Sequence, residues 1–562
     1  MNKVWKLKEI DNLKVDEYVK DFGISELMAK MLLAKDISEI KVDEYLKPDI
    51  AKLHDPYLLE DMDVLVNRIL LAKERKEKVA IYGDYDVDGI TSITLIYTFL
   101  KKLGIDTVYY LPDRIEEGYG LNTEAIKKLK DDGVTLVITV DCGISAVAEV
   151  EYARSIGLDI CITDHHECSD VLPNACSIVN PKRPGSEYPF NSLAGVGVTF
   201  KVLSAIVKRL NLPDNEYLKY LDIAAVGTIA DIVPLVGENR IITSNGLKLL
   251  KDTKNEGLKA LMKVAKIDKV DSDNVSFGIA PRINASGRMA DATVAVKMLL
   301  AENEMEAYKY AKVLDSQNTK RQEVEKAIYN EAIEIIEKEG LDKKKTMVIA
   351  GNKWHQGVVG IVASKLTEKY LKPVILLAYD GETAKGSGRI PSGISLYDAL
   401  TKCSDLLTTF GGHELAAGLT LETKNIESFK NKFEQVIISM KEEDFVRVID
   451  IDCEITKKDV SLNIINEIDR LAPFGQKNKK PTFMYKNLKV MSVSTLKEDK
   501  HLKFRLSDGD FHVDTVFFGA GNRRDEVTVG DKIDVAVNIS LNEFQGRKTL
   551  QFLMIDFKKS MN

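Results

Sequence analysis

The stretch Ile81-Tyr82-Gly83-Asp84-Tyr85-Asp86-Val87-Asp88-Gly89 decides how this chain is interpreted. An apolar run, residues 79–82, precedes three aspartates that alternate along the chain and end on a glycine. In an extended strand, residues i, i+2 and i+4 point to the same face. Three carboxylates that lie so close together repel one another unless a cation lies between them. The stretch therefore predicts a divalent metal site just beyond the end of a buried strand.

A calcium loop and a solvated acidic turn are the two alternative interpretations of these residues. The calcium-binding loop of an EF-hand needs a glutamate at its twelfth position. Counted from Asp84, that position is Leu95, which excludes the calcium loop. The solvated turn stays open on this stretch alone, so the decision depends on acidic residues elsewhere in the chain.

Acidic residues follow three further apolar segments, each of which we expect to be a strand. Residues 135–140 end in Asp141, residues 158–163 end in Asp164-His165-His166, and residues 223–230 precede Asp231. The carboxyl ends of parallel strands lie along one edge of a sheet, where α/β proteins bind ligands. A mixture of carboxylates and imidazole suits Mn²⁺ or Mg²⁺ better than a structural zinc ion. The pattern predicts a metal site at this edge.

These motifs resemble those of a known superfamily, the DHH phosphoesterases. The four matching segments are Asp84-Tyr-Asp-Val-Asp-Gly89, Asp141-Cys-Gly143, Asp164-His-His166 and Gly227-Thr-Ile-Ala-Asp231. Longer segments resemble the RecJ family of bacterial single-strand-specific 5′→3′ DNA exonucleases: Pro112-Asp-Arg-Ile-Glu-Glu-Gly-Tyr-Gly120, Leu193-Ala-Gly-Val-Gly-Val198, Pro281-Arg-Ile-Asn-Ala-Ser-Gly-Arg288, Trp354-His-Gln-Gly357 and Gly411-Gly-His-Glu-Leu-Ala-Ala-Gly418. The likeness runs from about Asp55 to the C-terminus, and several long motifs occur in the family's order.

The resemblance implies a centre of two divalent ions, Mn²⁺ or Mg²⁺, which catalyses phosphodiester hydrolysis. The implied metal ligands are Asp86, Asp88, Asp141, His165 and Asp231. Asp141 would bridge the ions, Asp86 would serve one of them, and Asp88, His165 and Asp231 would serve the other. Asp84, Asp164 and His166 are the remaining catalytic candidates: Asp84 or water completes the first metal, and His166 meets the phosphate beside Asp164.

The resemblance also implies residues that bind the substrate. Arginine is suited to bidentate contact with phosphate, and the expected phosphate-binding residues are Arg114, Arg282, Arg288, Ser387 and Arg389. The run Gly386-Ser387-Gly388-Arg389 resembles the family's pocket for a terminal 5′ phosphate, although Ile390 stands where the family often has a second serine. Further DNA contacts are expected from Tyr119, His355 and His413; a role in the core or in structure is the alternative for each.

Length and composition set limits on the class of protein. A chain of 562 residues suggests two to four domains, and 44% hydrophobic and 29% charged residues fit a globular protein. The net charge of −7 argues against a broadly basic surface but is compatible with local grooves that bind DNA. We expect no membrane span and no signal peptide. The six cysteines form no C-x-x-C pair, and we expect them to be reduced in the cytoplasm.

The order of expected elements divides the chain into five parts. The predicted architecture is α/β and multidomain: an N-terminal helical segment (1–75), a parallel-sheet DHH catalytic domain (76–302), a connector helix (303–340), a smaller α/β domain of DHHA1 type for substrate binding (341–445) and a nucleic-acid-binding OB-fold β-barrel (446–562). Polar residues at 318–322 interrupt the apolar stripe of the long helix, which favours a connector over a coiled-coil dimer. A β-sandwich is the alternative to the barrel.

The resemblance implies an enzyme that degrades single-stranded DNA from the 5′ end to mononucleotides, in DNA recombination and repair. It also implies a monomer with single-strand-binding protein and a RecQ-type helicase as partners. A hydrolase of pyrophosphate, cyclic dinucleotides or very short oligonucleotides is the second reading, but such relatives generally lack the barrel expected here at 446–562. A binding scaffold is the third reading, but inactive relatives have lost motif carboxylates or histidines that this chain keeps.

Overall fold

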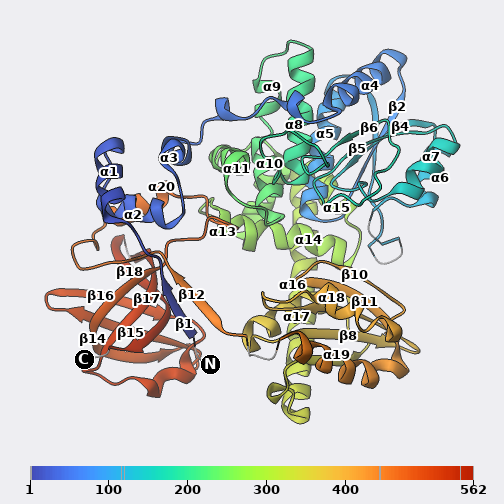
Figure 1. Cartoon of the computed structure of the whole chain (residues 1–562). Coiled ribbons are helices and arrows are strands. Elements are labelled where there is room, and N and C mark those ends of the chain that lie inside the picture. Colours follow the sequence, from blue (N-terminus) through green and yellow to red (C-terminus); the bar gives the residue numbers. More distant parts are fainter. Residues whose placement is uncertain (1–2, 115–116, 119, 442–444, 545, 561–562) are drawn as a thin grey trace.

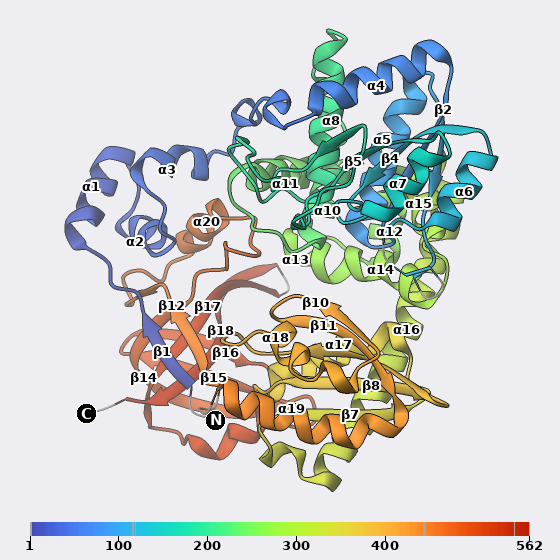
Figure 2. The same cartoon turned by 45° about the vertical axis from the view of Figure 1, so that its right-hand side comes forward.

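The computed structural model describes residues 3–114, 117–118, 120–441, 445–544 and 546–560. Three bodies surround a central space (Figure 1): a blue-to-green α/β domain, a yellow-to-orange α/β domain, and a red barrel beside the blue start of the chain. The turned view in Figure 2 keeps the same arrangement. Among the described residues, no helix is both long enough and apolar enough to cross a membrane.

The first domain contains a five-stranded, fully parallel sheet in the order β3-β2-β4-β5-β6. Its strands are β2 (Lys78–Gly83), β3 (Asp106–Tyr110), β4 (Val134–Val140), β5 (Asp159–Thr163) and β6 (Ser177–Val179). From β2 the chain first forms β3 on one side of β2, and then β4 on the other side. The direction in which strands are added therefore reverses between β2 and β4. In doubly wound sheets the ligand binds at such a reversal, and Asp84 and Asp141 follow these two strands directly.

Helices cover both faces of this sheet, as the alternation of expected elements predicts. One face packs against α4 (Met62–Arg75), α5 (Val87–Lys102) and α8 (Gly195–Arg209), and the other packs against α6 (Thr123–Asp131) and α7 (Val147–Ser155). Strand residues such as Ile81 and Ile138 are fully buried in the first of these cores. Burial on both faces explains why the strands read as continuous apolar runs.

The strand before Asp84 is confirmed, but the extended conformation considered for the three aspartates and the strand expected at residues 223–230 are not found. The strand β2 ends at Gly83, so Asp84 and Asp86 lie in the following turn and Asp88 lies in the first turn of α5. Residues 223–230 belong to helix α10 (Leu221–Ala230), with Asp231 at its C-terminal end. Residues 223–230 are a short apolar run, and a buried helix and a buried strand of that length have the same pattern. The carboxylates are therefore gathered by helix termini as well as by strand ends.

A helical layer completes the first domain and leads into the connector. Its helices are α9 (Asn215–Leu218), α11 (Gly237–Leu250), α12 (Glu256–Ala265), α13 (Ser272–Asn274), α14 (Ala280–Met289) and α15 (Thr293–Leu299). The connector α16 (Glu304–Glu339) has 36 residues and spans roughly 54 Å at 1.5 Å per residue. Ala307, Ala311 and Leu314 pack in the first domain's core, whereas Ile328, Ala332 and Ile336 pack in the second domain's core. The connector interpretation is confirmed.

The second α/β domain has a mixed sheet in the order β10-β11-β9-β8-β7. Its elements are β7 (Met347–Asn352), α17 (Gln356–Tyr370), β8 (Val374–Asp380), β9 (Thr383–Arg389), α18 (Leu396–Thr401), β10 (Thr409–Gly412), β11 (Ala416–Glu422) and α19 (Ile426–Met440). The predicted strand–helix–strand unit at β7, α17 and β8 is confirmed. The glycine-rich antiparallel strand β9 carries Ser387 and Arg389.

The C-terminal strands form a closed barrel, in which β14 pairs with both β15 and β17. Its elements are β12 (Arg447–Ile451), β13 (Cys453–Glu454), α20 (Asn463–Arg470), β14 (Phe483–Leu496), β15 (His501–Asp508), β16 (Phe511–Phe517), β17 (Lys532–Phe544) and β18 (Arg547–Lys559). Closure through five strands, β14 to β18, is the architecture expected of an OB-fold. It excludes the open β-sandwich.

The N-terminal segment is built into the barrel rather than being purely helical. It begins with β1 (Lys3–Leu7), which pairs in parallel with β12. The helices α1 (Asn12–Phe22), α2 (Glu26–Ala34) and α3 (Glu39–Leu46) share one hydrophobic core with the barrel strands. The indole nitrogen of Trp5 donates a hydrogen bond to Asp556 at 2.8 Å. The two ends of the sequence thus form a single body, which periodicity within either end does not reveal.

Candidate metal centre and substrate cleft

The turn after β2 brings three aspartates to the switch point of the parallel sheet. The side chain of Asp86 caps α5 by accepting a hydrogen bond from the Gly89 N–H at 3.0 Å. Asp84 is 6% exposed and Asp88 is 1% exposed, so two of the three carboxylates are buried. Carboxylates at the N-terminus of a helix benefit from its positive end, which offsets part of the cost of this burial.

The start of α8 holds Asp88 in place. The backbone N–H groups of Gly195 and Val196 each donate to one of its carboxylate oxygens at 2.7 Å. A Cβ on Gly195 would lie 2.7 Å from the Cβ of Asp141, so only glycine allows this approach. Two of the three aspartates on this side are therefore positioned by backbone contacts before any ion binds.

The imidazole of His165 lies at the centre of a group of carboxylates. Its Nε2 is 3.1 Å from Asp141 Oδ1, 3.6 Å from Asp231 Oδ2 and 3.8 Å from Asp88 Oδ2. Burial, and then the neighbouring His166, lower the pKa of His165 to about 3, so the ring is neutral at physiological pH. These contacts are consequently not ion pairs, and a neutral Nε2 offers the lone pair that a metal ion needs.

Crowding shifts the titration of the surrounding carboxylates. Burial, followed by the charge of Asp86, raises the pKa of both Asp84 and Asp88 to about 7. Burial, followed by the charge of Asp88, raises the pKa values of Asp141 and Asp231 well above the usual range. Shared negative charge on this scale is typical of sites that hold a cation.

The second histidine of the motif is oriented by a well-satisfied carboxylate. Asp164 accepts hydrogen bonds from the N–H groups of Ile144, His165 and His166 and lies 2.7 Å from Nδ1 of His166. Burial raises the pKa of Asp164, but these bonds, above all the one with His166, outweigh burial and lower it. The same contact raises the pKa of His166 against the effect of burial. Asp164 therefore holds Nδ1 and sets the orientation of the His166 ring.

The residues present fit a divalent metal centre. Three sets of ligand atoms lie within 4.8 Å of one another: Asp84, Asp86 and Asp141; Asp88, His165 and Asp231; and Asp141, His165 and His166. Within the described part of the chain, the buried atoms Asp84 Oδ1, His165 Nε2 and Asp231 Oδ2 have no hydrogen-bond partner. Buried polar atoms without partners are costly, and bound cations would supply the partners.

Three of the predicted arginines gather beside this centre. The guanidinium of Arg114 lies 5.0 Å from the ring centre of Tyr85, and Arg288 donates to the Gly357 carbonyl at 3.0 Å across the two α/β domains. Burial, and then the charge of Arg114, lower the pKa of Arg288 to about 10, with Arg389 contributing. Arg389 donates to Ser387 Oγ at 2.8 Å. A cluster of like charges with few carboxylates among them is a site for an anion.

The other predicted substrate residues have different surroundings. Arg282 makes an ion pair with Asp315 at 2.8 Å and donates to the Gly278 carbonyl, so it already has partners within the protein. His355 caps α17 by accepting from the Gly357 N–H at 3.2 Å. His413 is exposed in the turn between β10 and β11. Tyr119 lies outside the described residues.

Two residues near the centre were not anticipated. Asn180 is buried and donates to the His166 carbonyl at 3.0 Å, and Lys182 lines a hollow of about 820 Å³ together with His165, His166 and Asp231. The positive charge of Lys182 lowers the pKa of Asp231, although burial and the neighbouring aspartates outweigh it. Both residues come from the loop after β6, which has no motif of its own, so no sequence signal pointed to them.

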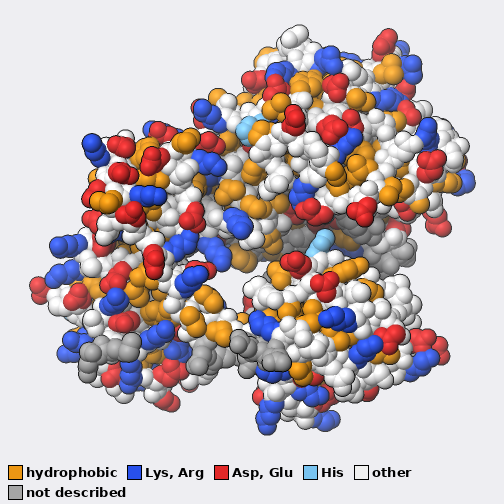
Figure 3. Space-filling view, in the orientation of Figure 1, with side chains coloured by type: hydrophobic (Ala, Val, Ile, Leu, Met, Phe, Trp, Pro, Cys, Tyr) orange, Lys and Arg blue, Asp and Glu red, His pale blue; other side chains and the backbone are white. Residues whose placement is uncertain are grey.

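A larger cleft of about 1340 Å³ lies between the bodies of the molecule. Its lining comes from α10 and the residues after it up to 235, the segment 273–288, the connector α16, α17 and the loop 474–480 of the barrel body. Figure 3 shows the hollow between the three bodies, with blue Lys and Arg side chains along its rim on the barrel side. Six Lys or Arg residues and two acidic residues line the cleft. The cleft is therefore locally positive, although the net charge of the chain is −7.

Family models match the three domains in this order. The model described as "DHH family, N-terminal domain" matches residues 78–228, the "DHHA1 domain" model matches residues 343–439, and the "RecJ OB domain" model matches residues 451–556. The parallel sheet, the carboxylate–histidine site at its edge and the first of these matches define a phosphoesterase of the DHH class.

Individual relatives narrow this class. The chain is 38% identical over 559 residues to the single-stranded-DNA-specific exonuclease RecJ of Bacillus subtilis, across 98% of this chain and 70% of that protein. It is 34% identical to the RecJ of Escherichia coli, across 85% and 86% of the two chains. A crystal structure of RecJ from Thermus thermophilus with Mn²⁺ superposes with a TM-score of 0.87 at 27% identity, covering all of this chain and 80% of that one. This chain belongs to the RecJ family.

Proposed function

We propose that this protein is a metal-dependent exonuclease that degrades single-stranded DNA from the 5′ end to mononucleotides by phosphodiester hydrolysis. The observation that carries the proposal is the carboxylate–histidine centre beside a cluster of arginines, in a chain whose relatives in Bacillus subtilis and Escherichia coli are named single-stranded-DNA-specific exonucleases. The same centre could serve a small substrate, but the closed barrel and the large cationic cleft favour a polymer.

The metal ligands in this proposal are Asp86, Asp88, Asp141, His165 and Asp231, with Asp84 as a further candidate. Two Mn²⁺ or Mg²⁺ ions, when bound there, supply Lewis-acid activation of water and of the phosphate. The short distances from His165 Nε2 to the carboxylates of Asp141 and Asp231 support a metal centre that these residues share. Relatives from Thermus thermophilus have been crystallised with Mn²⁺ and with Mg²⁺, which supports both ions as candidates.

The chain's own residues account for positioning and proton control. His166, oriented through Nδ1 by Asp164, is assigned to contact the substrate phosphate. The backbone N–H groups at the start of α8 fix Asp88 so that it does not turn away from the centre. Lys182, in the hollow beside His165, offers a charge to the departing end of the product.

Recognition of the 5′ end is assigned to Ser387, Arg389, Arg288 and Arg114. Arg389 and Ser387 lie beside Gly360 of α17, where a Cβ would be 3.0 Å from the serine hydroxyl and 3.2 Å from the guanidinium. That narrow space suits a phosphate group rather than a bulky side chain. Arg282, Tyr119, His355 and His413 remain predictions as further contacts to the strand.

The cellular setting is part of the proposal. We infer a monomeric cytoplasmic enzyme of DNA recombination and repair that works with single-strand-binding protein and a RecQ-type helicase. A helicase separates strands and so supplies the single strands that the enzyme consumes. The domain boundaries that we propose are 1–75, 76–302, 303–340, 341–445 and 446–562; within the first part, residues up to α3 share a core with the barrel, whereas α4 packs against the parallel sheet.

A labelled strand tests polarity, strand preference and metal dependence together. We expect a 5′-labelled strand to release labelled mononucleotide at once in Mn²⁺ or Mg²⁺, and a 3′-labelled strand to shorten gradually. A hairpin at the 5′ end should block both reactions. Arg389→Ala should reduce the preference for a 5′ phosphate over a 5′ hydroxyl. Equal attack on 5′-hairpin and open strands would overturn the proposal.

A further inference from the structure

Two large apolar side chains are exposed in the cleft, whose lining also carries six Lys or Arg residues. Phe277 is 81% exposed and Ile232 is 71% exposed, and both line the cleft. Leaving one such side chain in water forgoes roughly 1.5–3 kcal/mol of burial free energy. Exposure on this scale at a concave, cationic surface indicates a ligand that has both apolar and anionic parts.

The backbone holds Phe277 in this position. It lies at the middle of a five-residue π-helical turn, Val275–Ile279, whose two end residues are each 1% exposed. A Cβ on Gly278 would lie 2.8 Å from Ile267, so the turn is packed closely against the domain. Single π-helical turns occur frequently at functional sites. The ring is therefore exposed on a fixed support and not on a loose loop.

Ile232 is held in a strained conformation. Its φ is 62°, in the left-handed region that β-branched residues avoid because of steric crowding. Such residues cost about 1–3 kcal/mol and persist where the surroundings impose them. Here the hydrogen bond from the Leu235 N–H to the Gln476 carbonyl, at 2.8 Å, ties the segment to the barrel body. Ile232 directly follows Asp231, so the strain lies next to the metal centre.

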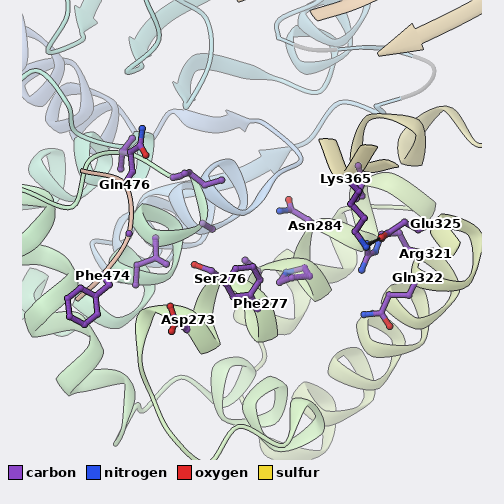
Figure 4. Close-up of a pocket in the computed structure, with 18 of the residues that line it drawn as sticks. Asp273, Ser276, Phe277, Asn284, Arg321, Gln322, Glu325, Lys365, Phe474 and Gln476 are labelled. Carbon is purple, nitrogen blue, oxygen red and sulfur yellow. Dashed lines mark hydrogen bonds and ion pairs between the residues drawn. The ribbon is translucent and has the colours of Figure 1, made fainter. Parts of the chain in front are cut away.

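Residues of the barrel body and of the connector side of the cleft lie on opposite sides of Phe277. Figure 4 shows its ring between Phe474 and Gln476 on one side and the group of Arg321, Glu325 and Lys365 on the other. Lys480 joins the two bodies through an ion pair with Asp273 at 2.6 Å. A strand that passes through this cleft has its phosphates near cations and its bases near the apolar side chains.

We propose that Phe277 and Ile232 form an apolar base-contact surface that orients the single strand on its way to the metal centre. The inference rests on the proposed function and adds the residues that contact the bases. Stacking on aromatic side chains does not depend on sequence, because every base has an apolar face. Stacking requires unpaired bases. This surface therefore favours single strands, and it does so in addition to any selection by the width of the cleft.

Binding to ordinary and abasic strands tests this surface directly. The affinity of a fluorescent, 5′-phosphorylated oligothymidylate is measured with chelator present, so that no hydrolysis interferes, beside a strand of equal length in which the central bases are missing. Phe277→Ala should weaken binding of the ordinary strand about tenfold and leave binding of the abasic strand near that of the parent protein. Phe277→Trp, which keeps an aromatic face, should restore binding.

Two further variants complete the test. Ile232→Gly removes the side chain at a φ that glycine tolerates, and it should act in the same direction with a smaller change. Met305→Ala is the matched control, because Met305 is 84% exposed but does not line the cleft. Equal losses on ordinary and abasic strands would overturn the base-contact role. If the parent protein hydrolyses the strand while Phe277→Ala binds normally, this inference alone fails; if the parent neither binds nor hydrolyses it, the proposed function fails as well.

Discussion

Two groups of buried ionisable side chains lie in the same domain, and they balance their charges in opposite ways. In the carboxylate cluster (Asp84, Asp88, Asp141, His165 and Asp231), four carboxyl groups with raised pKa values lie together and the histidine is neutral. In the Glu238 cluster (Glu238, Lys201, Tyr188 and the His54 backbone), Lys201 is 2.8 Å from Glu238, and Tyr188 and the His54 N–H also donate to that carboxylate.

The difference separates a structural use of buried charge from a functional one. Lys201 and Glu238 are each 1% exposed, and each is satisfied by partners inside the protein. In the carboxylate cluster the fold supplies backbone donors to Asp88, but among the described residues no Lys or Arg side chain forms an ion pair with Asp84, Asp88 or Asp231. Burial alone therefore does not distinguish the clusters. What distinguishes them is whether the protein itself completes the charge balance.

Replacing Asp141 should have the largest effect. Asp141→Asn removes a charge shared by two of the ligand sets, and we expect hydrolysis of a single strand to fall by about 1000-fold or more. The metal-free variant should be at least as stable as the parent, because it has less repulsion. Rate measurements and chemical denaturation check both parts. A near-normal rate would show that this cluster is not the catalytic centre.

A substitution in the Glu238 cluster should have the opposite result: stability should fall while hydrolysis persists. Glu238→Gln leaves the Lys201 charge buried without a carboxylate, and the free energy of unfolding should fall by about 3–5 kcal/mol. Hydrolysis per folded molecule should persist, since Glu238 is not among the candidate ligands. Adding Lys201→Met should recover part of the stability. If the denaturation midpoint of Glu238→Gln were unchanged, internal charge balance would not stabilise the Glu238 cluster. The distinction between the two clusters would then fail.

Asp164 is an intermediate case, because it is a buried carboxylate beside the centre with its own donors. Asp164→Asn keeps the shape but weakens the hold on His166, and we expect hydrolysis to fall about 10–100-fold. The pH profile should also move, since the pKa of His166 is raised by Asp164. A rate loss with an unchanged profile would assign Asp164 a purely structural role.

The two clusters also differ in how far the sequence predicts them. Asp84, Asp141 and His165 follow apolar runs within short motifs, so their meeting at one sheet edge is predictable. Lys201, Tyr188 and Glu238 are far apart in sequence and lie in no pattern, so only tertiary contacts reveal the second cluster. The same reason explains the missed pairing of β1 with β12. The error at residues 223–230 has a local cause, because a short apolar run fits a buried helix as well as a buried strand. Local periodicity identifies elements, but it does not say which distant segments share a core.

The smallest expected effect links metal binding to pH. In the metal-free protein the pKa values of Asp84 and Asp88 are about 7, against a usual value of 3.8. The folded state thus keeps protons that the unfolded chain loses, and this contribution to stability, fully present below pH 3.8, is lost as the pH rises through 7. Divalent ions need the deprotonated carboxylates, so stabilisation by Mn²⁺ should grow over the same range.

Thermal unfolding measures this effect. The gain in Tm on adding Mn²⁺ should be a few degrees larger at pH 8 than at pH 5.5. The double variant Asp84→Asn, Asp88→Asn should lose part of this pH dependence, because the two amides release no protons whereas Asp141 and Asp231 still do. Glu238→Gln is the control: its metal-induced gain should keep the parent's pH dependence despite its lower starting Tm. If Mn²⁺ stabilised the parent equally at both pH values, the carboxylates would already be ionised, and the contrast between the clusters would lose its electrostatic basis.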